Sequence, residues 1–373
     1  MHGECTIGAE SFKREICRKT GVQTTKRGAH MNLNPVAERY SRQVLFRPIG
    51  SAGQEKLRQA RVAVVGMGAL GTVMATQLVR AGVGFVRLID RDIIEPSNLQ
   101  RQSLYDESDA EAGMPKAVAA AQKLQLANSL VQIEPIVTDL TWRNAESLLS
   151  DVDVVMDGTD NFQVRYLIND VSVKHHIAWA YGGAVSSYGT TAFFRPGQTP
   201  CLVCLFGKDP GGGHDTCDTV GVIAPAVSMV ASLQVVEALK YLTGNEQALA
   251  SSLIHLDVWN NEFRSVHFGS ANPDCPCCAH REFASLTVKT DSLTVSMCGR
   301  QTIQVRPQNP PQASLEQIAQ RLQQVGAVRQ NPHLLRCDLG DVQITLFADG
   351  RALIHGTDDE AKARSVYARY IGM

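Results

Sequence analysis

The segment 61–116 constrains the fold of this chain more than any other part of the sequence. It opens with the apolar run Val62–Val65, passes directly into the glycine loop Gly66–Gly71, and continues with helical periodicity until a second apolar run ends at Asp90. A G-x-G-x-x-G sequence between a strand and a helix, followed by an acidic residue at the end of the next strand, is typical of a nucleotide-binding unit. We therefore expect a Rossmann-like α/β fold, with a mainly parallel sheet and flanking helices.

Each part of this unit has an expected task. Gly66, Gly68 and Gly71 let the backbone approach a phosphate, and the helix N-terminus offers it unpaired N–H groups and a partial positive charge. Asp90 is placed to accept hydrogen bonds from ribose hydroxyls. Taken alone, the fingerprint is weak, because most such loops hold a dinucleotide and some glycine clusters serve only close packing.

The residues after Asp90 are unlike those of a dehydrogenase. Asp92, Asn98 and Gln102 crowd around Arg101, and Lys116 follows shortly after. A guanidinium and an ammonium beside a phosphate-binding turn suit a triphosphate that is cleaved, because both stabilise charge developing on the phosphates. A nicotinamide carrier needs no such pair.

The rest of the core alternates between strand and helix patterns, which predicts a parallel sheet with ligands at the carboxyl ends of its strands. We expect these elements, by residue range: helices at 115–126, 145–149 and 223–242, the last broken by Pro225, and strands at 131–137, 151–157, 177–185 and 189–194. Asp160 stands just beyond one strand end. It can hold magnesium near a nucleotide, or it can cap the helix that starts near Asn161.

The ten cysteines point to metal ligands or reactive thiols before disulfides, because the chain shows no secretion signal. Cys201 and Cys204 form one C-x-x-C pair, and Cys275 and Cys278 form another. Four thiolates close a tetrahedral structural zinc site. The long separation between the pairs leaves a redox pair or buried thiols open, and Cys277 is an extra thiol inside the second pair.

Composition excludes several classes of protein. Lys+Arg of 36 against Asp+Glu of 37 gives a formal net charge of -1, which argues against nucleic-acid binding through bulk charge. No apolar stretch reaches the roughly 18 residues of a membrane span. The first thirty residues lack the apolar run of a secretory signal, so we expect a cytoplasmic protein. We interpret residues 1–34 as a disordered extension or a start called too early, with Met31 as the real start.

The chain changes character after Phe283. A strand at 301–306, a capping-box start at Ser314, a hairpin around Asp349-Gly350 and a last helix opening at Thr357 predict a small α+β domain over 286–373. The role of this domain is open.

Several motifs together resemble the ubiquitin-activating-enzyme-like adenylyltransferases of the ThiF/MoeB/HesA family. They are the Arg-Tyr-Ser-Arg-Gln sequence at 39–43, the glycine loop, the Ser-Asn-Leu-Gln-Arg-Gln sequence at 97–102, Lys116 and the Gly-Thr-Asp-Asn sequence at 158–161. The resemblance covers roughly residues 36–285, and Cys298-Gly299-Arg300 stands where some ThiF-like proteins begin a similar tail.

The resemblance implies ATP-dependent adenylation of the C-terminal glycine of a ubiquitin-like sulfur carrier with a Gly-Gly tail. It implies that Arg101, Lys116 and Arg42 hold phosphates, with Arg42 reaching the neighbouring subunit of a homodimer. It implies Mg²⁺ at Asp160, and Asn98 and Gln102 orienting the phosphates or the incoming tail. Cys217, on a glycine-rich loop, would take part in covalent transfer or be an ordinary loop cysteine.

The same resemblance favours zinc for the four paired cysteines, and it implies a separate sulfur donor, a cysteine desulfurase or a rhodanese. The carrier belongs to thiamin or molybdopterin synthesis, and the missing rhodanese domain tilts the expectation toward thiamin. Adenylation of a peptide or siderophore carboxylate is an alternative. A NAD-dependent dehydrogenase and a catalytically silent scaffold are more remote ones.

Overall fold

The computed structural model describes residues 38–207, 220–287, 294–296, 301–307, 311 and 313–372, with backbone alone for 294–296. Arg42–Met373 belong to one compact unit, whose described strands form two sheets. None of the described helices is long and apolar enough to cross a bilayer.

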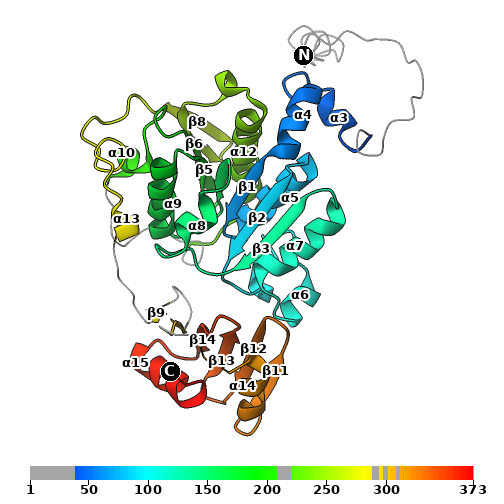
Figure 1. The fold of residues 1–373 in the computed structure, drawn as a ribbon, viewed down its shortest axis with the longest axis vertical. Helices are drawn as coiled ribbons and strands as arrows, with labels where there is room; N and C mark the ends of the chain where they lie inside the picture. Colours follow the sequence, from blue (N-terminus) through cyan, green and yellow to red (C-terminus); the bar gives the residue numbers. More distant parts are fainter. Residues whose placement is uncertain are drawn as a thin grey trace, which may run out of the picture. The chain divides into compact units, whose positions relative to one another are not determined.

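The larger sheet has eight strands in the order β3-β2-β1-β4-β5-β6-β7-β8 (Figure 1). Their bounds are β1 Arg61–Val65, β2 Phe85–Asp90, β3 Gln132–Val137, β4 Val154–Asp157, β5 Ala178–Val185, β6 Tyr188–Phe194, β7 Ser252–Asp257 and β8 Glu262–His267. The first five strands in this order, β3, β2, β1, β4 and β5, pair in parallel. Strands β6, β7 and β8 continue the sheet with antiparallel pairing. The expected mainly parallel sheet is confirmed.

Helices cover both faces of the sheet because β1 is apolar on both sides (Figure 1). Val62 and Val64 pack into one core, and Ala63 and Val65 into the other, as the period of two requires. The first core also takes residues from α4 (Gly50–Gln59), α5 (Ala69–Ala81), α7 (Lys116–Ala127) and α12 (Ala224–Thr243). The second takes residues from α8 (Ala145–Leu149), α9 (Phe162–His175), α10 (Leu202–Phe206) and α13 (Ala284–Thr287).

The strand order has a switch point between β1 and β4, which is where open α/β sheets bind ligands. The chain runs outward from β1 to β2 and β3, then crosses back to β4 on the other side of β1. Loops diverge at such a switch point, which leaves a crevice at the carboxyl ends of the strands. The glycine loop follows β1, and the segment with Asp160 follows β4.

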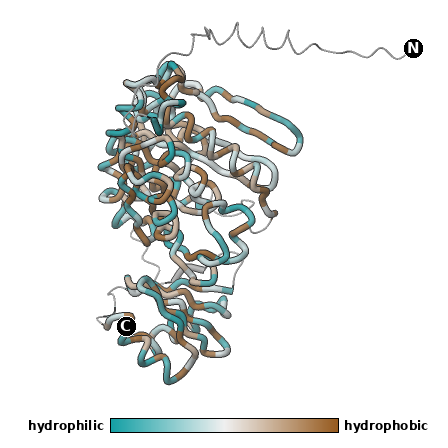
Figure 2. Tube along the Cα trace, turned by 90° about the vertical axis from the view of Figure 1, so that its right-hand side faces the viewer, coloured by the Kyte–Doolittle hydropathy of each residue, from teal (hydrophilic) through white to brown (hydrophobic). Residues whose placement is uncertain are grey.

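The second sheet is antiparallel throughout, in the order β11-β12-β13-β14-β10-β9. Its strands are β9 Thr294–Ser296, β10 Thr302–Val305, β11 Ala327–Gln330, β12 Leu334–Asp338, β13 Gln343–Phe347 and β14 Ala352–His355. Helices α14 (Leu315–Leu322) and α15 (Glu360–Tyr370) pack on it through a separate apolar core. Hydrophobic and hydrophilic residues both occur along this part of the chain (Figure 2).

Three local expectations need correction. Pro225 does not break its helix, because it lies in the first turn of α12, where a missing N–H costs nothing. Strand β4 begins at Val154 and not at residue 151, because its pairing with β1 begins with Val62 opposite Val154. Asp359 caps α15 in place of Thr357. The capping box at Ser314 is confirmed.

Candidate nucleotide site and cysteine cluster

The three glycines of the loop after β1 differ in whether a side chain would fit at their positions. Gly66 has φ 86°, and a Cβ there would lie 2.8 Å from the Gly158 carbonyl oxygen. A Cβ on Gly71 would lie 1.8 Å from the Gly66 carbonyl oxygen, so neither position accepts a side chain. Gly68 has space, since the nearest atom to its Cβ position is Gln102 Nε2 at 3.8 Å. The backbone is therefore open to a ligand at Gly68, where α5 begins.

Asp90 ties the glycine loop to the segment that follows β2. Its Oδ2 accepts a hydrogen bond from the Met67 N–H at 2.6 Å, and its Oδ1 accepts one from the Asp92 N–H at 2.6 Å. Burial raises the pKa of Asp90 despite the nearby charge of Lys116. The structure thus gives Asp90 a structural task at the position where the sequence predicts a ribose ligand.

Asp92 and Lys116 form an ion pair, with Lys116 Nζ 3.2 Å from Asp92 Oδ2. A backbone bond from Lys116 N–H to the Asp92 carbonyl oxygen, 2.9 Å, holds the two segments together. Burial alone would raise the pKa of Asp92, but the charges of Lys116 and Arg91 outweigh it and lower this pKa to about 2. Both groups are therefore charged at neutral pH. Sequence analysis places both residues in the site and does not anticipate the pair.

Tyr105 is a site residue that sequence analysis misses. Its buried hydroxyl lies 2.8 Å from the Met67 carbonyl oxygen and 3.1 Å from that of Lys116, and it can donate to either. It thereby links the glycine loop to the start of α7. The sequence offers no signal for this role beyond a lone tyrosine after the Arg101 segment.

The other residues around Arg101 divide by burial. Asn98 is 2% exposed and accepts a hydrogen bond from the Glu95 N–H at 3.2 Å, which makes it part of a capping box. Gln102 is also buried, and its Oε1 has no hydrogen-bond partner among the described residues. An orphaned buried acceptor beside Gly68 fits a ligand that donates to it. Arg101 is half-buried, and its Nη1 donates to the Ser97 carbonyl oxygen at 2.9 Å.

Asp160 is exposed and does not cap α9, because Asn161 does: its Oδ1 accepts from the Gln163 N–H at 2.8 Å. The charge of Asp160 contributes to the raised pKa of Lys116, so the two side chains share one electrostatic environment. The alternative of Asp160 as a helix cap is wrong, and its carboxylate is left available for a cation.

The buried side chain of Arg165 supports the turn that carries Asp160, a role that the sequence does not predict. Arg165 Nε donates to Asp157 Oδ2 at 3.0 Å, and its Nη2 donates to the carbonyl oxygens of Thr159 at 2.6 Å and Gly182 at 2.9 Å. Burial opposes the charge of Arg165, but Asp157 outweighs it and the pKa of Arg165 is raised. The turn that carries Asp160 is therefore fixed on its inner side.

Two more predicted catalytic residues are Arg42 and Cys217. Arg42 is exposed on α3 (Ser41–Val44), and the structure shows no ion pair from it to another described residue. Cys217 lies outside the described residues, as does Cys298.

The four paired cysteines come together. Their Sγ atoms lie within 4.8 Å of one another. The separations are 3.9 Å for Cys201–Cys204, 3.6 Å for Cys201–Cys275 and 3.4 Å for Cys204–Cys278. Four sulfurs bound tetrahedrally to zinc at about 2.3 Å lie about 3.8 Å apart, so the cluster fits that ion.

Cys277 lies beside this cluster and bonds helix α9. Its Sγ accepts a hydrogen bond from Asn169 Nδ2 at 3.2 Å and donates to Asp170 Oδ1 at 3.4 Å, both on α9. Asn169 Oδ1 also accepts from the Leu202 N–H at 2.8 Å, at the start of α10. The extra thiol thus holds the cysteine cluster against α9.

Comparison with known proteins agrees with this geometry. A sequence model described as the ThiF family matches residues 40–277. The chain is 47% identical over 336 residues to the sulfur carrier protein ThiS adenylyltransferase of Bacillus subtilis, which is 90% of this chain and 99% of the relative. It is 40% identical over 247 residues to a sulfur carrier protein adenylyltransferase of Thermus thermophilus, which is 65% of this chain and 90% of the relative.

A solved structure of E. coli MccB with MccA-N7isoASN has a TM-score of 0.59 and 21% identity, covering 74% of this chain and 83% of that chain. It shows a shared fold. The dehydrogenase alternative rests on the glycine loop and Asp90 alone, and neither it nor the scaffold alternative accounts for these matches. The chain therefore belongs to the ThiF family and is an adenylyltransferase.

Proposed function

We propose that this adenylyltransferase activates the C-terminal glycine carboxylate of a ubiquitin-like sulfur-carrier protein with a Gly-Gly tail. The observation that carries the proposal is the 47% identity to a relative named for ThiS adenylylation, over 90% of this chain and 99% of that relative. A match over nearly the full length of both chains includes the C-terminal sheet, which a match to the core alone does not.

The proposed reaction is attack of the carboxylate on the α-phosphorus of ATP, with loss of pyrophosphate and formation of an acyl-adenylate. A carboxylate is already ionised at neutral pH, so the reaction needs no general base. Its rate depends on positioning and on stabilising charge on the phosphates. Lys116 is suited to this task because its ammonium is charged and held at one place by Asp92.

We assign the remaining roles by position. Arg101 binds phosphates beside Lys116, and the open backbone at Gly68 receives them at the N-terminus of α5. Gln102, with its orphaned Oε1, orients the nucleotide or the incoming tail, as does Asn98. Asp90 accepts from the ribose with lone pairs that its two backbone bonds leave over.

We propose two metals. Asp160 holds Mg²⁺, which would neutralise charge on the phosphates. Zn²⁺ binds Cys201, Cys204, Cys275 and Cys278, and such a fully thiolate site is structural because it has no open position for substrate. It would join the start of α10 to the chain after the large sheet.

We further propose a homodimer in which Arg42 completes the site of the neighbouring subunit. Leu45 and Phe46, which follow α3, are 71% and 60% exposed, and a second copy would cover them. Cys217 is our proposed partner in covalent transfer.

The wider setting is proposed as well. We propose a cytoplasmic protein that works with a cysteine desulfurase or a rhodanese as sulfur donor. We propose that residues 35–285 form the adenylyltransferase domain and that residues 286–373 form a small second domain. Residues 1–34 would be an extension or a start called too early.

Of the two sulfur-carrier pathways, we favour thiamin over molybdopterin synthesis, since the relative matched over 99% of its length is named for ThiS. The test is pyrophosphate exchange into ATP, run on purified protein with Mg²⁺ and a panel of carriers, each beside a version without its terminal glycine. Exchange that appears with one carrier and disappears with its truncated form would support the proposal and identify the carrier. An ATP-binding protein that shows exchange with a peptide or siderophore carboxylate and with no carrier would overturn it.

A further inference from the structure

A buried arginine of the C-terminal sheet bonds the backbone of the segment that carries Asp92. Arg351 is 1% exposed, although it lies in the turn between β13 and β14. Its Nη2 donates to the Arg91 carbonyl oxygen at 2.7 Å, and its guanidinium lies 3.7 Å from the centre of the Phe347 ring. Buried arginines are rare unless they are paired, and Arg351 pairs within its own turn, with its Nε 3.7 Å from Asp349 Oδ2.

The charge of Arg351 acts on the ion pair already described. Burial raises the pKa of Asp92, and Lys116, Arg91 and Arg351 together lower it. Burial lowers the pKa of Arg351 itself, and Asp349 and Asp92 oppose that shift. The charge of Arg351 thus acts on the Asp92 carboxylate in addition to those of Lys116 and Arg91.

A second set of bonds holds the same sheet to the end of β3. Asp139 Oδ2 accepts a hydrogen bond from Gln304 Nε2 at 2.8 Å and also pairs with Arg306, both from β10 and the residues after it. Asp139 Oδ1 accepts from Arg91 Nη1 at 2.9 Å. Arg91 is thus bonded to the C-terminal sheet directly and through Asp139.

The sheet also contacts the segment before Lys116. A Cβ on Gly113 would lie 2.8 Å from Arg336 Cζ, and Asn331 Nδ2 donates to the Ala112 carbonyl oxygen at 3.2 Å. Ile93, next to Asp92, packs in an apolar cluster with Leu334, Phe347 and Leu353. The two segments that carry Asp92 and Lys116 are therefore both supported by one sheet.

We propose that the C-terminal sheet is a positioning element of the nucleotide site and that Arg351 is its positioning residue. The positive charge of Arg351 partly offsets the negative charge of Asp92. Lys116 is then held near this carboxylate but can still bind a polyphosphate. Without Arg351, Asp92 would draw Lys116 more strongly and repel the phosphates. This inference rests on the proposed function for the identity of the ligand.

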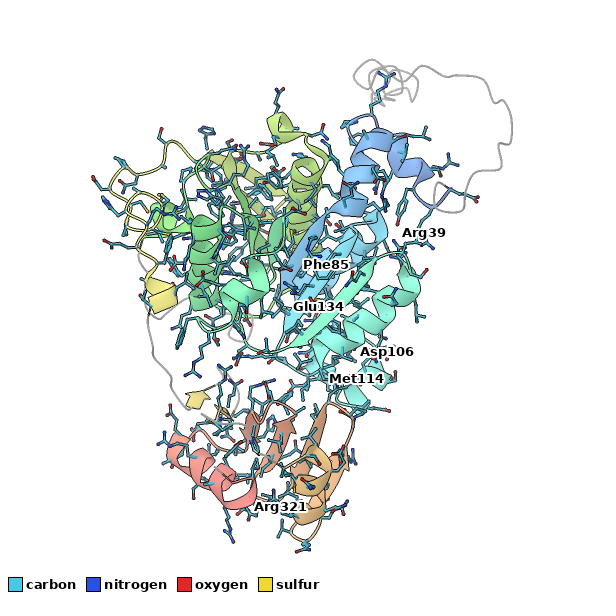
Figure 3. The ribbon with its side chains drawn as sticks, in the orientation of Figure 1. Arg39, Phe85, Asp106, Met114, Glu134 and Arg321 are labelled. Carbon is cyan, nitrogen blue, oxygen red and sulfur yellow. The ribbon has the colours of Figure 1, made fainter. Side chains whose placement is uncertain are left out.

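The test is the affinity for ATP, measured by calorimetry on the full chain with Mg²⁺ and without a carrier. We expect Arg351→Met to weaken ATP binding about tenfold, as loss of one nearby charge does. Arg351→Lys retains the charge and should recover most of the affinity. Arg321→Met is the matched control, because Arg321 is an exposed arginine of α14 in the same domain (Figure 3).

A double-mutant cycle separates positioning from general stability. If Arg351 acts through Asp92, Arg351→Met should have a much smaller effect on ATP affinity in an Asp92→Asn background. Where a carrier is active, KM for ATP should rise while kcat stays near that of the parent.

Unchanged ATP affinity in a folded Arg351→Met protein overturns the proposal. Should that variant not fold, Asp139→Asn decides instead, because it weakens the same support away from the ion pair, and unchanged affinity there overturns the proposal. Failure of every carrier to be adenylated would count against the proposed function and leave this ATP measurement valid.

Discussion

Lys116 and Lys123 lie on the same helix and both pair with aspartates, but only Lys116 lies beside the glycine loop. We expect Lys116→Met to lower the rate of pyrophosphate exchange about 100-fold or more, since a charge aimed at the phosphates is lost. Lys123→Met, which loses its pairs with Asp109 and with Asp106 (Figure 3), should change it little. Equal losses in the two variants would argue against a role for Lys116 at the phosphates.

Gly71 and Gly68 make a second comparison between residues. Gly71→Ala places a Cβ 1.8 Å from the Gly66 carbonyl oxygen, which should lower the free energy of unfolding by about 3 kcal/mol. Gly68→Ala meets only an ordinary contact at 3.8 Å, so it should stay folded and raise KM for ATP by crowding the phosphates. Urea unfolding and exchange kinetics on both variants check this. A Gly68→Ala protein as unstable as Gly71→Ala would contradict it.

Among the helices and strands, caps and turns could be predicted where the residues that form them lie close together in the sequence. The capping box at Ser314 involves residues three positions apart, so the start of α14 could be predicted. The strands β11 and β12 could not, because Arg329, Gln330 and Arg336 interrupt any apolar alternation there. Strand β11 depends on pairing with β12, and β12 depends on pairing with β13, so both need contacts beyond their own residues.

The cysteine cluster is the element whose removal is simplest to test. Cys278→Ser should lower the amount of bound zinc below one equivalent per chain. It should also reduce Tm by roughly 10 °C, because the ion joins two distant segments. Cys277→Ser is the control, since Cys277 bonds Asn169 and Asp170 and a hydroxyl can replace its thiol. Zinc content by mass spectrometry and thermal melting measure both. Full zinc content in Cys278→Ser would remove this residue from the ligand set.

At the scale of the whole molecule, the proposed dimer predicts complementation. Arg42→Ala and Lys116→Met should each be nearly inactive, and subunits mixed after dissociation should regain activity at about a quarter of the sites, because each mixed dimer has one intact site. Pyrophosphate exchange before and after mixing measures it. No recovery, with mixed dimers shown to form, would place Arg42 in its own subunit's site or in none.

The sequence by itself determined the α/β class and the glycine loop, and it predicted the residue types of the candidate site, because these signals lie within short segments. The spacing from Gly66 to Gly71 and the two C-x-x-C pairs are of this kind. It also indicated the family, since several motifs occur in order along the chain.

Only the tertiary structure decided which of these residues face one another. The pairing of Asp92 with Lys116 depends on two segments 24 residues apart being bonded side by side. The bond from Arg351 to the Arg91 carbonyl oxygen spans 260 residues. Burial and charge make such contacts favourable only once the sheets have formed, so no local pattern in the sequence could reveal them.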